Sequence, residues 1–249
     1  MKILLIAGHG AGDSGAVAKI DGKTYKEAEL TREVVKNLKP KLEAYGAKVA
    51  VYPTTRNAYP DSQSGTLQAN ADFKAADYIL EIHFNAGRSD LKGDGKVAGD
   101  ECYWPSRGKA TGLEKPMTSR LFQGYAQRQS KSGAFSVINT SATHGKKANL
   151  LEVCFIDDAD DMRIYLKSKD NVAQNIADGV AEYFNLKKED EPMFSDIKDN
   201  KYRADIEWAA KMGIVTGYSD GTFRPDNKIT RAKCMRYLHK LYKIIKEGK

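Results

Sequence analysis

The sequence predicts an α/β fold, an open and mostly parallel sheet with helices on both faces, followed by a small, mainly helical module. Short apolar runs alternate with segments of helical periodicity, an order typical of parallel sheets covered on both faces. The residue pattern changes after a charged stretch at 187–192 that contains a proline. We therefore expect a first domain over residues 1–186, a linker at 187–193 and a second module over 194–246.

The first strands of the predicted sheet lie in residues 3–83. The apolar run at residues 3–7 predicts a buried strand that ends at His9, between two glycines. Apolar residues at helical spacing then predict a helix from near Glu27 to Gly46. The next expected elements are a strand at 48–52, a polar loop at 54–64, a helix at 66–75 and a strand at 78–83. Because the carboxyl ends of parallel strands meet at one sheet edge, His83 and His9 should converge there.

The rest of the first domain continues the alternation. Its expected elements are a strand at 100–104, a long helix at 108–130, a short apolar run at 135–138, a polar loop at 139–147, a strand at 149–155 and helices at 158–166 and 170–184. Glu152 lies within the strand at 149–155, where a carboxylate is costly unless something pairs with it. The end of this strand should reach the edge that carries His9 and His83.

These polar residues suggest a metal site. Two imidazoles and one carboxylate are a common ligand set for catalytic zinc (Zn²⁺), and a further carboxylate can serve as general base. The pattern suggests His9, Glu27 and His83 as ligands and Glu152 as base. Glu29 is the competing carboxylate, but it points about 200° around the helix from Glu27. A single histidine at a strand end is more often structural, so the prediction depends on the combination.

Other kinds of site fit the sequence less well. Residues 10–15 match the G-x-G-x-x-G pattern of dinucleotide-binding loops, but Asp21 and a glycine interrupt the segment before any helix begins. The Gly-Lys-Ser/Thr sequence of a phosphate-binding P-loop is absent. Cys102, Cys154 and Cys234 lack the spacing of a structural zinc site, and we expect them to be reduced thiols.

The order of the motifs resembles the zinc-dependent N-acetylmuramoyl-L-alanine amidases over about the first three-quarters of the chain. The resemblance rests on the Gly-His-Gly strand end, the glutamate at a helix start, the His-x-Asn-Ala strand end and the Glu-x-x-Phe strand that contains Glu152. It implies an amidase in which His9, Glu27 and His83 hold zinc and Glu152 is the catalytic base.

Four neighbouring polar residues have secondary expectations. Asn85 should orient either substrate or its own loop, and His144 is either a solvated loop histidine or a substrate contact. Glu81 precedes His83 by two residues and shares its strand face, where it can support that ligand. Glu101 matches a Gly-x-Glu strand of the family and is given no role in the chemistry.

The composition, with 41% hydrophobic and 29% charged residues, is that of an ordinary globular protein. No apolar run approaches the roughly 20 residues that span a bilayer, so no membrane insertion is expected. The run at 3–7 is too short for a signal peptide and has no clear cleavage site after it. We therefore expect the protein to stay in the cytoplasm until something releases it.

The chain's positive charge is concentrated in its tail. From Pro192 onward there are 13 Lys and Arg against 7 Asp and Glu, which is +6 of the net charge of +7. A basic module predicts an anionic partner, either nucleic acid or an acidic polymer. The sequences Gly-Tyr-Ser-Asp-Gly-Thr-Phe-Arg-Pro at 217–225 and Ile-Thr-Arg-Ala at 229–232 strongly resemble one S-layer homology repeat, which begins at Phe194.

This second resemblance implies binding to the anionic secondary polysaccharide of Gram-positive cell walls, with Arg231 in the place of the glycan-contacting arginine. A guanidinium suits that task because its planar fork can grip a carboxylate at two points. Lys233 stands where the family usually has glutamate, so the detail of glycan recognition should differ. The aromatic residues already belong to the repeat pattern, and no nucleic acid is expected as partner.

Together, these features predict a peptidoglycan hydrolase that cuts the amide between N-acetylmuramic acid and L-alanine. A zinc catalyst with a wall-binding module and no signal peptide is typical of a phage endolysin, kept in the host cytoplasm before it reaches the bacterial cell wall. A host autolysin, a zinc peptidase that cuts the stem peptide, and a non-catalytic wall-binding protein are the alternatives. One repeat buries little core, so we expect the tails to form a homo-oligomer, three together.

Overall fold

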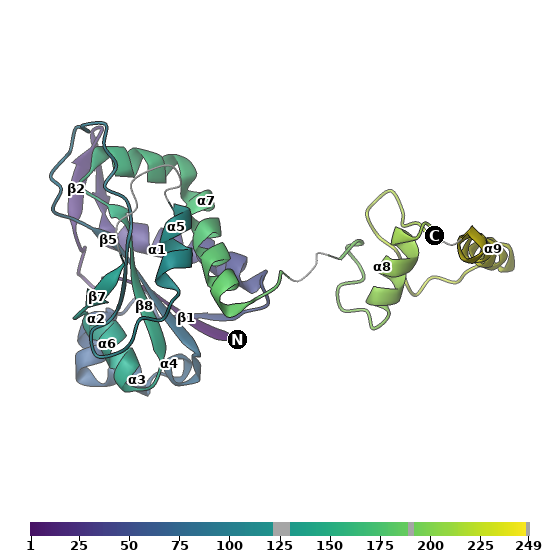
Figure 1. The fold of residues 1–249 in the computed structure, drawn as a ribbon, viewed down its shortest axis with the longest axis horizontal. Coiled ribbons are helices and arrows are strands. Elements are labelled where there is room, and N and C mark those ends of the chain that lie inside the picture. The colour runs from purple at the N-terminus through teal and green to yellow at the C-terminus, as the bar shows by residue number, and fades with distance from the viewer. Residues whose placement is uncertain (122–129, 189–191, 248–249) are drawn as a thin grey trace. The chain divides into compact units, whose positions relative to one another are not determined.

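A six-stranded sheet organises the first of two units in the computed structural model. Residues 1–121, 130–188 and 192–247 are described, and the chain divides into units Met1–Lys188 and Glu189–Lys249. The strand order is β4-β1-β5-β8-β6-β7 (Figure 1). The strands span Lys48–Val51 (β4), Lys2–Ala7 (β1), Tyr78–Asn85 (β5), Lys147–Phe155 (β8), Glu101–Pro105 (β6) and Lys131–Gly133 (β7).

The first four strands in this order are parallel, as the sequence predicts. β6 runs antiparallel to β8, and β7 is parallel to β6, so one edge of the sheet has the opposite direction. The sequence of β6 does not indicate whether this strand runs parallel or antiparallel to β8. The predicted mostly parallel sheet is confirmed, with a two-stranded antiparallel edge added to it.

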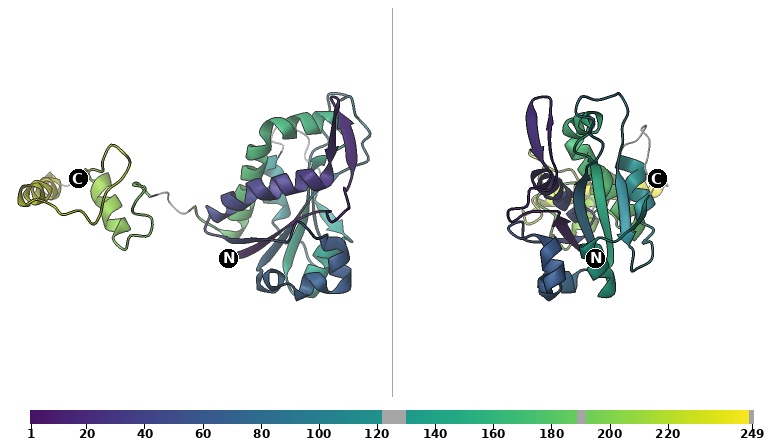
Figure 2. Two further views of the ribbon diagram at one scale, coloured as in Figure 1. Left: turned by 180° about the vertical axis from the view of Figure 1, so that it is seen from behind. Right: turned by 90° about the vertical axis from the view of Figure 1, so that its left-hand side faces the viewer.

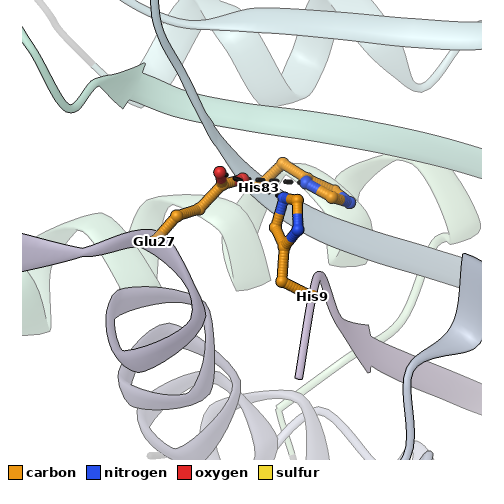
Figure 3. Close-up of side chains that lie close together, drawn as sticks. All are labelled: His9, Glu27 and His83. Carbon is orange, nitrogen blue, oxygen red and sulfur yellow. Dashed lines mark hydrogen bonds and ion pairs between the residues drawn. The ribbon is translucent and has the colours of Figure 1, made fainter. Parts of the chain in front are cut away.

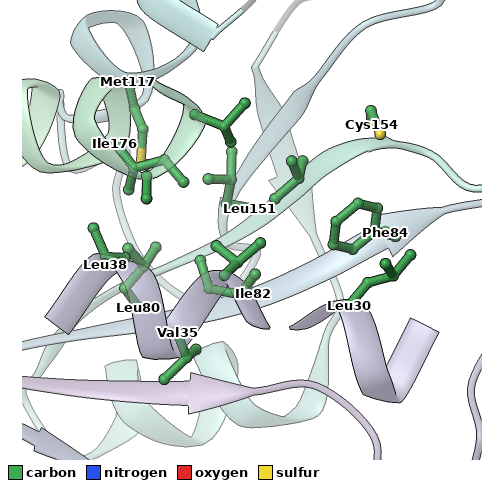
Figure 4. Packing of buried hydrophobic residues seen from close by; sticks show 14 of the residues in the cluster. Leu30, Val35, Leu38, Leu80, Ile82, Phe84, Met117, Leu151, Cys154 and Ile176 are labelled. Carbon is green, nitrogen blue, oxygen red and sulfur yellow. The ribbon is translucent and has the colours of Figure 1, made fainter. Parts of the chain in front are cut away.

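Helices cover both faces of the sheet (Figure 2). On β1, alternate side chains enter different cores: Ile3 and Leu5 join one cluster, and Leu4 and Ile6 join the other. The first core also takes residues from α1 (Glu27–Glu43), α5 (Glu114–Leu121) and α7 (Ala159–Phe184), and part of it is drawn in Figure 4. The second core takes residues from α2 (Ala58–Ser64), α3 (Thr66–Ala69), α4 (Ala71–Ala75) and α6 (Ser136–Thr143).

Several helices differ from the prediction. The expected polar loop at 54–64 contains α2, which Asn57 caps by accepting the backbone N–H of Tyr59. The expected run and loop at 135–147 contain α6, because Val137 and Ile138 pack into the second core. The expected helix at 66–75 is split into α3 and α4 by the cap at Asn70.

One further helix has unexpected bounds, and the break predicted between two later helices is present. The helix predicted at 108–130 begins only at Glu114, and its predicted part at 122–129 lies outside the described residues. The two helices predicted at 158–166 and 170–184 correspond to the two segments of α7, and non-helical backbone angles at Ser168 separate these segments where the break was expected.

A hairpin lies between the first histidine and α1. Its strands are β2 (Val17–Ile20) and β3 (Lys23–Lys26), joined by Asp21 and Gly22, both with positive φ as a tight hairpin turn requires. The glycines at 10–15 therefore lead into a hairpin and not into a helix, in agreement with the rejection of a dinucleotide-binding loop.

The second unit contains α8 (Arg203–Lys211) and α9 (Arg231–Glu247). Among its described residues, the buried apolar side chains are Ile197, Ile214 and Val215. Asp196 accepts the backbone N–H groups of Phe223 and Arg224 and so ties the start of the unit to its central loop. In the described parts of both units, none of the helices has the length and apolar character needed to cross a membrane.

Candidate metal centre

Three side chains from separate elements point toward one another at the carboxyl edge of the parallel strands (Figure 3). His9 follows β1, Glu27 is the first residue of α1, and His83 lies near the end of β5. Nε2 of His9 is 3.0 Å from Oε2 of Glu27, and Nδ1 of His83 is 2.9 Å from Oε1 of the same carboxylate. One ligand atom from each residue lies within 4.8 Å of the others, a spacing that could hold a metal ion.

Glycines permit this close approach. A Cβ on Gly8 would lie 2.3 Å from Cε1 of the His83 ring, and one on Gly15 would lie 2.6 Å from Oε2 of Glu27. His9 itself has φ of 64°, an uncommon value for a residue with a side chain. The glycine-rich sequence around His9 thus serves the packing of the cluster.

Glu27 is the electrostatic centre of the cluster, with only 4% of its surface exposed. It accepts hydrogen bonds from both imidazoles and from the backbone N–H groups of Ala16 and Phe84. Burial alone would raise the pKa of Glu27, but its hydrogen bonds with His83 and His9 outweigh burial and hold that pKa well below its usual range. The site therefore keeps an ionised carboxylate between two imidazoles.

A second layer of carboxylates holds the other nitrogen of each imidazole. Asp13 Oδ2 lies 2.8 Å from Nδ1 of His9, and Glu81 Oε1 lies 3.2 Å from Nε2 of His83. Metal-binding histidines usually have such a partner, which fixes the ring and its tautomer. This donor set fits zinc, with two imidazole nitrogens and one carboxylate facing a common point. The sequence indicated Glu81 by its spacing, whereas Asp13 lies in a turn with positive φ values that no periodicity describes.

Glu152 lies beside this cluster on β8. It is in register with His83 of β5 on one side and Glu101 of β6 on the other. Its Oε2 is buried, with no hydrogen-bond partner among the described residues. Burial raises the pKa of Glu152 to about 7, and the carboxylates of Glu27 and Glu81 add to the effect. A carboxyl group with such a pKa is suited to proton transfer at neutral pH.

The other candidate residues lie as follows. Glu29 is exposed and pairs with Lys26, away from the two imidazoles. The Asn85 amide donates to Glu101 Oε2 and accepts the N–H of Ala86, so both of its ends are engaged within the protein. His144 is exposed at the end of α6, where Nδ1 faces the Thr140 carbonyl oxygen and the ring contacts Phe73. The structure thus joins neither Glu29 nor His144 to the cluster.

Glu101 and the remaining candidates have separate surroundings. Glu101 is buried and accepts from Tyr103 and Lys131 as well as from Asn85. Cys102 and Cys154 are buried free thiols, and Cys234 is a partly exposed free thiol, in agreement with the prediction. Arg231 is the first residue of α9 and is exposed.

A cavity of about 650 Å³ opens beside the two imidazoles. Among its described lining residues are His9, His83 and Glu81 from the cluster, and Arg107, Phe135 and Asn139 from the β6–α6 side. This is a size that suits a small ligand or one segment of a polymer. The cluster therefore faces a space in which a substrate can lie.

Comparisons with known proteins identify the families that the two parts of the chain match. Residues 3–182 match the family model for N-acetylmuramoyl-L-alanine amidase, and residues 194–232 match that for the S-layer homology domain. An endolysin of Bacillus phage SPP1 is 30% identical over an alignment of 198 residues, and the match covers 75% of this chain and 67% of that protein.

Solved structures share the fold of the first unit. The catalytic domain of CwlV, an N-acetylmuramoyl-L-alanine amidase from Bacillus (Paenibacillus) polymyxa var. colistinus, aligns with a TM-score of 0.57 at 26% identity, over 75% of this chain and all of that one. The amidase AmiC2 of Nostoc punctiforme aligns with a TM-score of 0.59 at 19% identity, over 74% and 97%.

Proposed function

Because the chain belongs to the family of N-acetylmuramoyl-L-alanine amidases, we propose that it hydrolyses its amide with a zinc ion held by His9, Glu27 and His83. It is a peptidoglycan amidase joined to an S-layer homology domain, which associates with the cell wall. The observation that supports zinc is the set of three ligand atoms within 4.8 Å of one another.

The residues around the proposed zinc site have different roles in the reaction. A bound zinc ion would supply Lewis acidity toward the lactyl carbonyl oxygen and toward water. The Glu152 carboxylate takes a proton from the attacking water and passes it to the departing amine of L-alanine. The C–N bond breaks, which leaves a carboxylate on the glycan and a free amine on the stem peptide. Asp13 and Glu81 keep the two imidazoles oriented throughout.

Mass spectrometry of a digest of purified walls tests this reaction. The expected products are glycan strands without peptide and stem peptides that begin with a free L-alanine. A new amine inside the stem peptide would instead identify a zinc peptidase, and intact walls would identify a non-catalytic wall-binding protein.

The second layer gives a prediction about metal affinity. Changing Asp13 to Asn or Glu81 to Gln should weaken zinc binding about 10- to 100-fold, because each change removes the partner that orients an imidazole but keeps all three ligands. Competition with a chromogenic chelator measures the affinity. Glu43→Gln, an exposed change at the far end of α1, is the control. Wild-type affinity in both test variants would contradict the orienting role.

We assign binding of an anionic secondary wall polysaccharide to Arg231. Arg231→Ala should reduce co-sedimentation of the protein with walls several-fold, since a guanidinium can hold an acidic group at two points. Arg236→Ala, also exposed on α9, serves as the matched control. Equal binding by both variants, or undiminished binding to walls stripped of the polysaccharide, would contradict this assignment.

We also assign the enzyme to lysis of a host bacterium by a phage, on the support of its similarity to the SPP1 endolysin. In that role it stays in the host cytoplasm until the membrane opens. Cells that produce it should lyse only after the membrane is permeabilised. Lysis before that step would indicate an autolysin that reaches the wall by another route.

Self-association of the tail is supported by an exposed stripe on α9. Met235, Leu238, Tyr242 and Ile245 follow a three- and four-residue spacing, and between 53% and 70% of each residue's surface is exposed. α8 has no buried residue, so neither helix supplies a closed core. Such a stripe can pack against the same stripe of other copies, and we expect three chains to associate.

Light scattering at micromolar concentration measures this association. The wild-type protein should have about three times the mass of the chain, and Leu238→Arg should have the mass of a monomer. A Lys243→Ala variant, altered at an exposed position on another side of α9, should associate like wild type. A monomeric wild-type protein that still binds walls would show that one repeat is sufficient.

A further inference from the structure

The substrate cavity has one arginine or lysine in its described lining, Arg107. The acidic residues of that lining, Asp13 and Glu81, contact the two imidazoles at the proposed metal site. Apart from those charges, the described lining is made of neutral polar, aromatic and aliphatic side chains. The cavity therefore holds a metal-ligand cluster and a separate fixed positive charge.

Hydrogen bonds to neighbouring elements hold the backbone at Arg107 in place. Its N–H donates to Oδ1 of Asn139 at 3.0 Å, and Nδ2 of Asn139 donates to Oγ of Ser106 at 3.1 Å. The N–H of Ser106 donates to the carbonyl oxygen of Gly133 on β7. These bonds connect the turn after β6 to α6 and to the sheet edge, so Arg107 projects from a defined position.

The guanidinium of Arg107 has no carboxylate partner among the described residues. Other arginines of the chain do have one: Arg56 pairs with Asp61, and Arg163 pairs with Asp21. Arg107 is exposed, so its charge is solvated and costs the fold little. A solvated arginine in a substrate cavity has its fork of N–H donors available for a carboxylate.

We propose that Arg107 binds a free carboxylate of the stem peptide close to the scissile amide and thereby selects among peptidoglycans. The inference rests on the proposed amidase reaction. The stem residue after L-alanine is a glutamate linked through its side chain, and its α-carboxylate is free in some walls and amidated in others. Free carboxylates satisfy the guanidinium, whereas the neutral amide leaves its charge without a partner. A cavity of about 650 Å³ can enclose the sugar and the first two peptide residues.

Two substrates of the same size separate this role from others. They are disaccharide dipeptides in which the side-chain carboxyl of the second residue is capped as its methylamide, in place of the stem linkage. The α-group of that residue is a free carboxylate (D-glutamate) in one and a primary amide (D-isoglutamine) in the other. The wild-type enzyme should cleave the first with about tenfold higher kcat/KM, mostly through KM, because an ionic hydrogen bond is lost with the second. Arg107→Ala should abolish that preference by losing activity on the carboxylate substrate alone. Arg107→Lys should keep part of it.

Controls make the outcomes distinct. Lys109→Ala, an exposed change two residues away that lines a different cavity, should retain the wild-type preference. Equal losses on both substrates in Arg107→Ala, or no loss on either, would overturn the proposal. If the wild-type enzyme cleaves neither substrate nor whole walls, the proposed reaction fails instead. Cleavage of whole walls but of neither dipeptide, with the ratio of activities on non-amidated and amidated walls the same in Arg107→Ala as in wild type, also overturns the role of Arg107.

Discussion

Replacing Glu152 with Gln should abolish wall lysis and leave the zinc content unchanged. The amide keeps the shape of the side chain but cannot take a proton from water, and a general base typically contributes 10²- to 10⁴-fold to the rate. Glu152 is not among the three residues that hold the metal in our assignment, so its loss removes chemistry and spares binding. Turbidity of a wall suspension measures lysis, and elemental analysis measures zinc.

The environment of Glu152 makes this variant informative. Its buried Oε2 has no described partner, so the substitution breaks no hydrogen bond at that oxygen. The thermal midpoint should therefore stay close to that of wild type. Glu29→Gln is the matched control, because it makes the same change at an exposed glutamate away from the cavity. Full activity of Glu152→Gln with zinc still bound would refute the assignment of Glu152 as base.

The core of the site is predictable from sequence for a topological reason. His9 and His83 end parallel strands, and Glu27 begins the helix that packs on them, so the expected sheet brings them together. Glu81 follows from the two-residue period of β5. These predictions need only the order of the elements and not their detailed packing.

The remaining parts of the site depend on local backbone and on packing. Asp13 reaches His9 through a turn with positive φ values at His9 and Ala11, which a pattern of apolar residues cannot indicate. Arg107 lines the cavity from a turn whose N–H donates to Asn139 of α6. That helix forms in a segment of β-branched and small polar residues, where packing of Val137 into the core outweighs weak helix propensity. Asp13 and Arg107 are single polar residues in turns. Their neighbours in space are set by the tertiary structure, so their roles could not be predicted from the sequence pattern.

Glu27 and Glu29 should differ sharply in their effect on the metal. Glu27→Ala removes one of three protein ligands and leaves a buried gap between two imidazoles, so purified protein should contain little zinc. Wall lysis should fall to background for the same reason. Glu29→Ala should retain the zinc content and the activity of wild type, since this carboxylate is exposed and contacts Lys26.

The comparison also separates loss of metal from loss of fold. Glu27 accepts the N–H groups of Ala16 and Phe84, so its removal can loosen the structure as well as the site. Glu27→Gln addresses this point, because its amide oxygen can still accept a backbone N–H while the side chain lacks the charge that zinc favours. A folded Glu27→Gln protein with low zinc content supports ligation. Low zinc in Glu29→Ala with normal zinc in both Glu27 variants would show that the wrong carboxylate has been assigned.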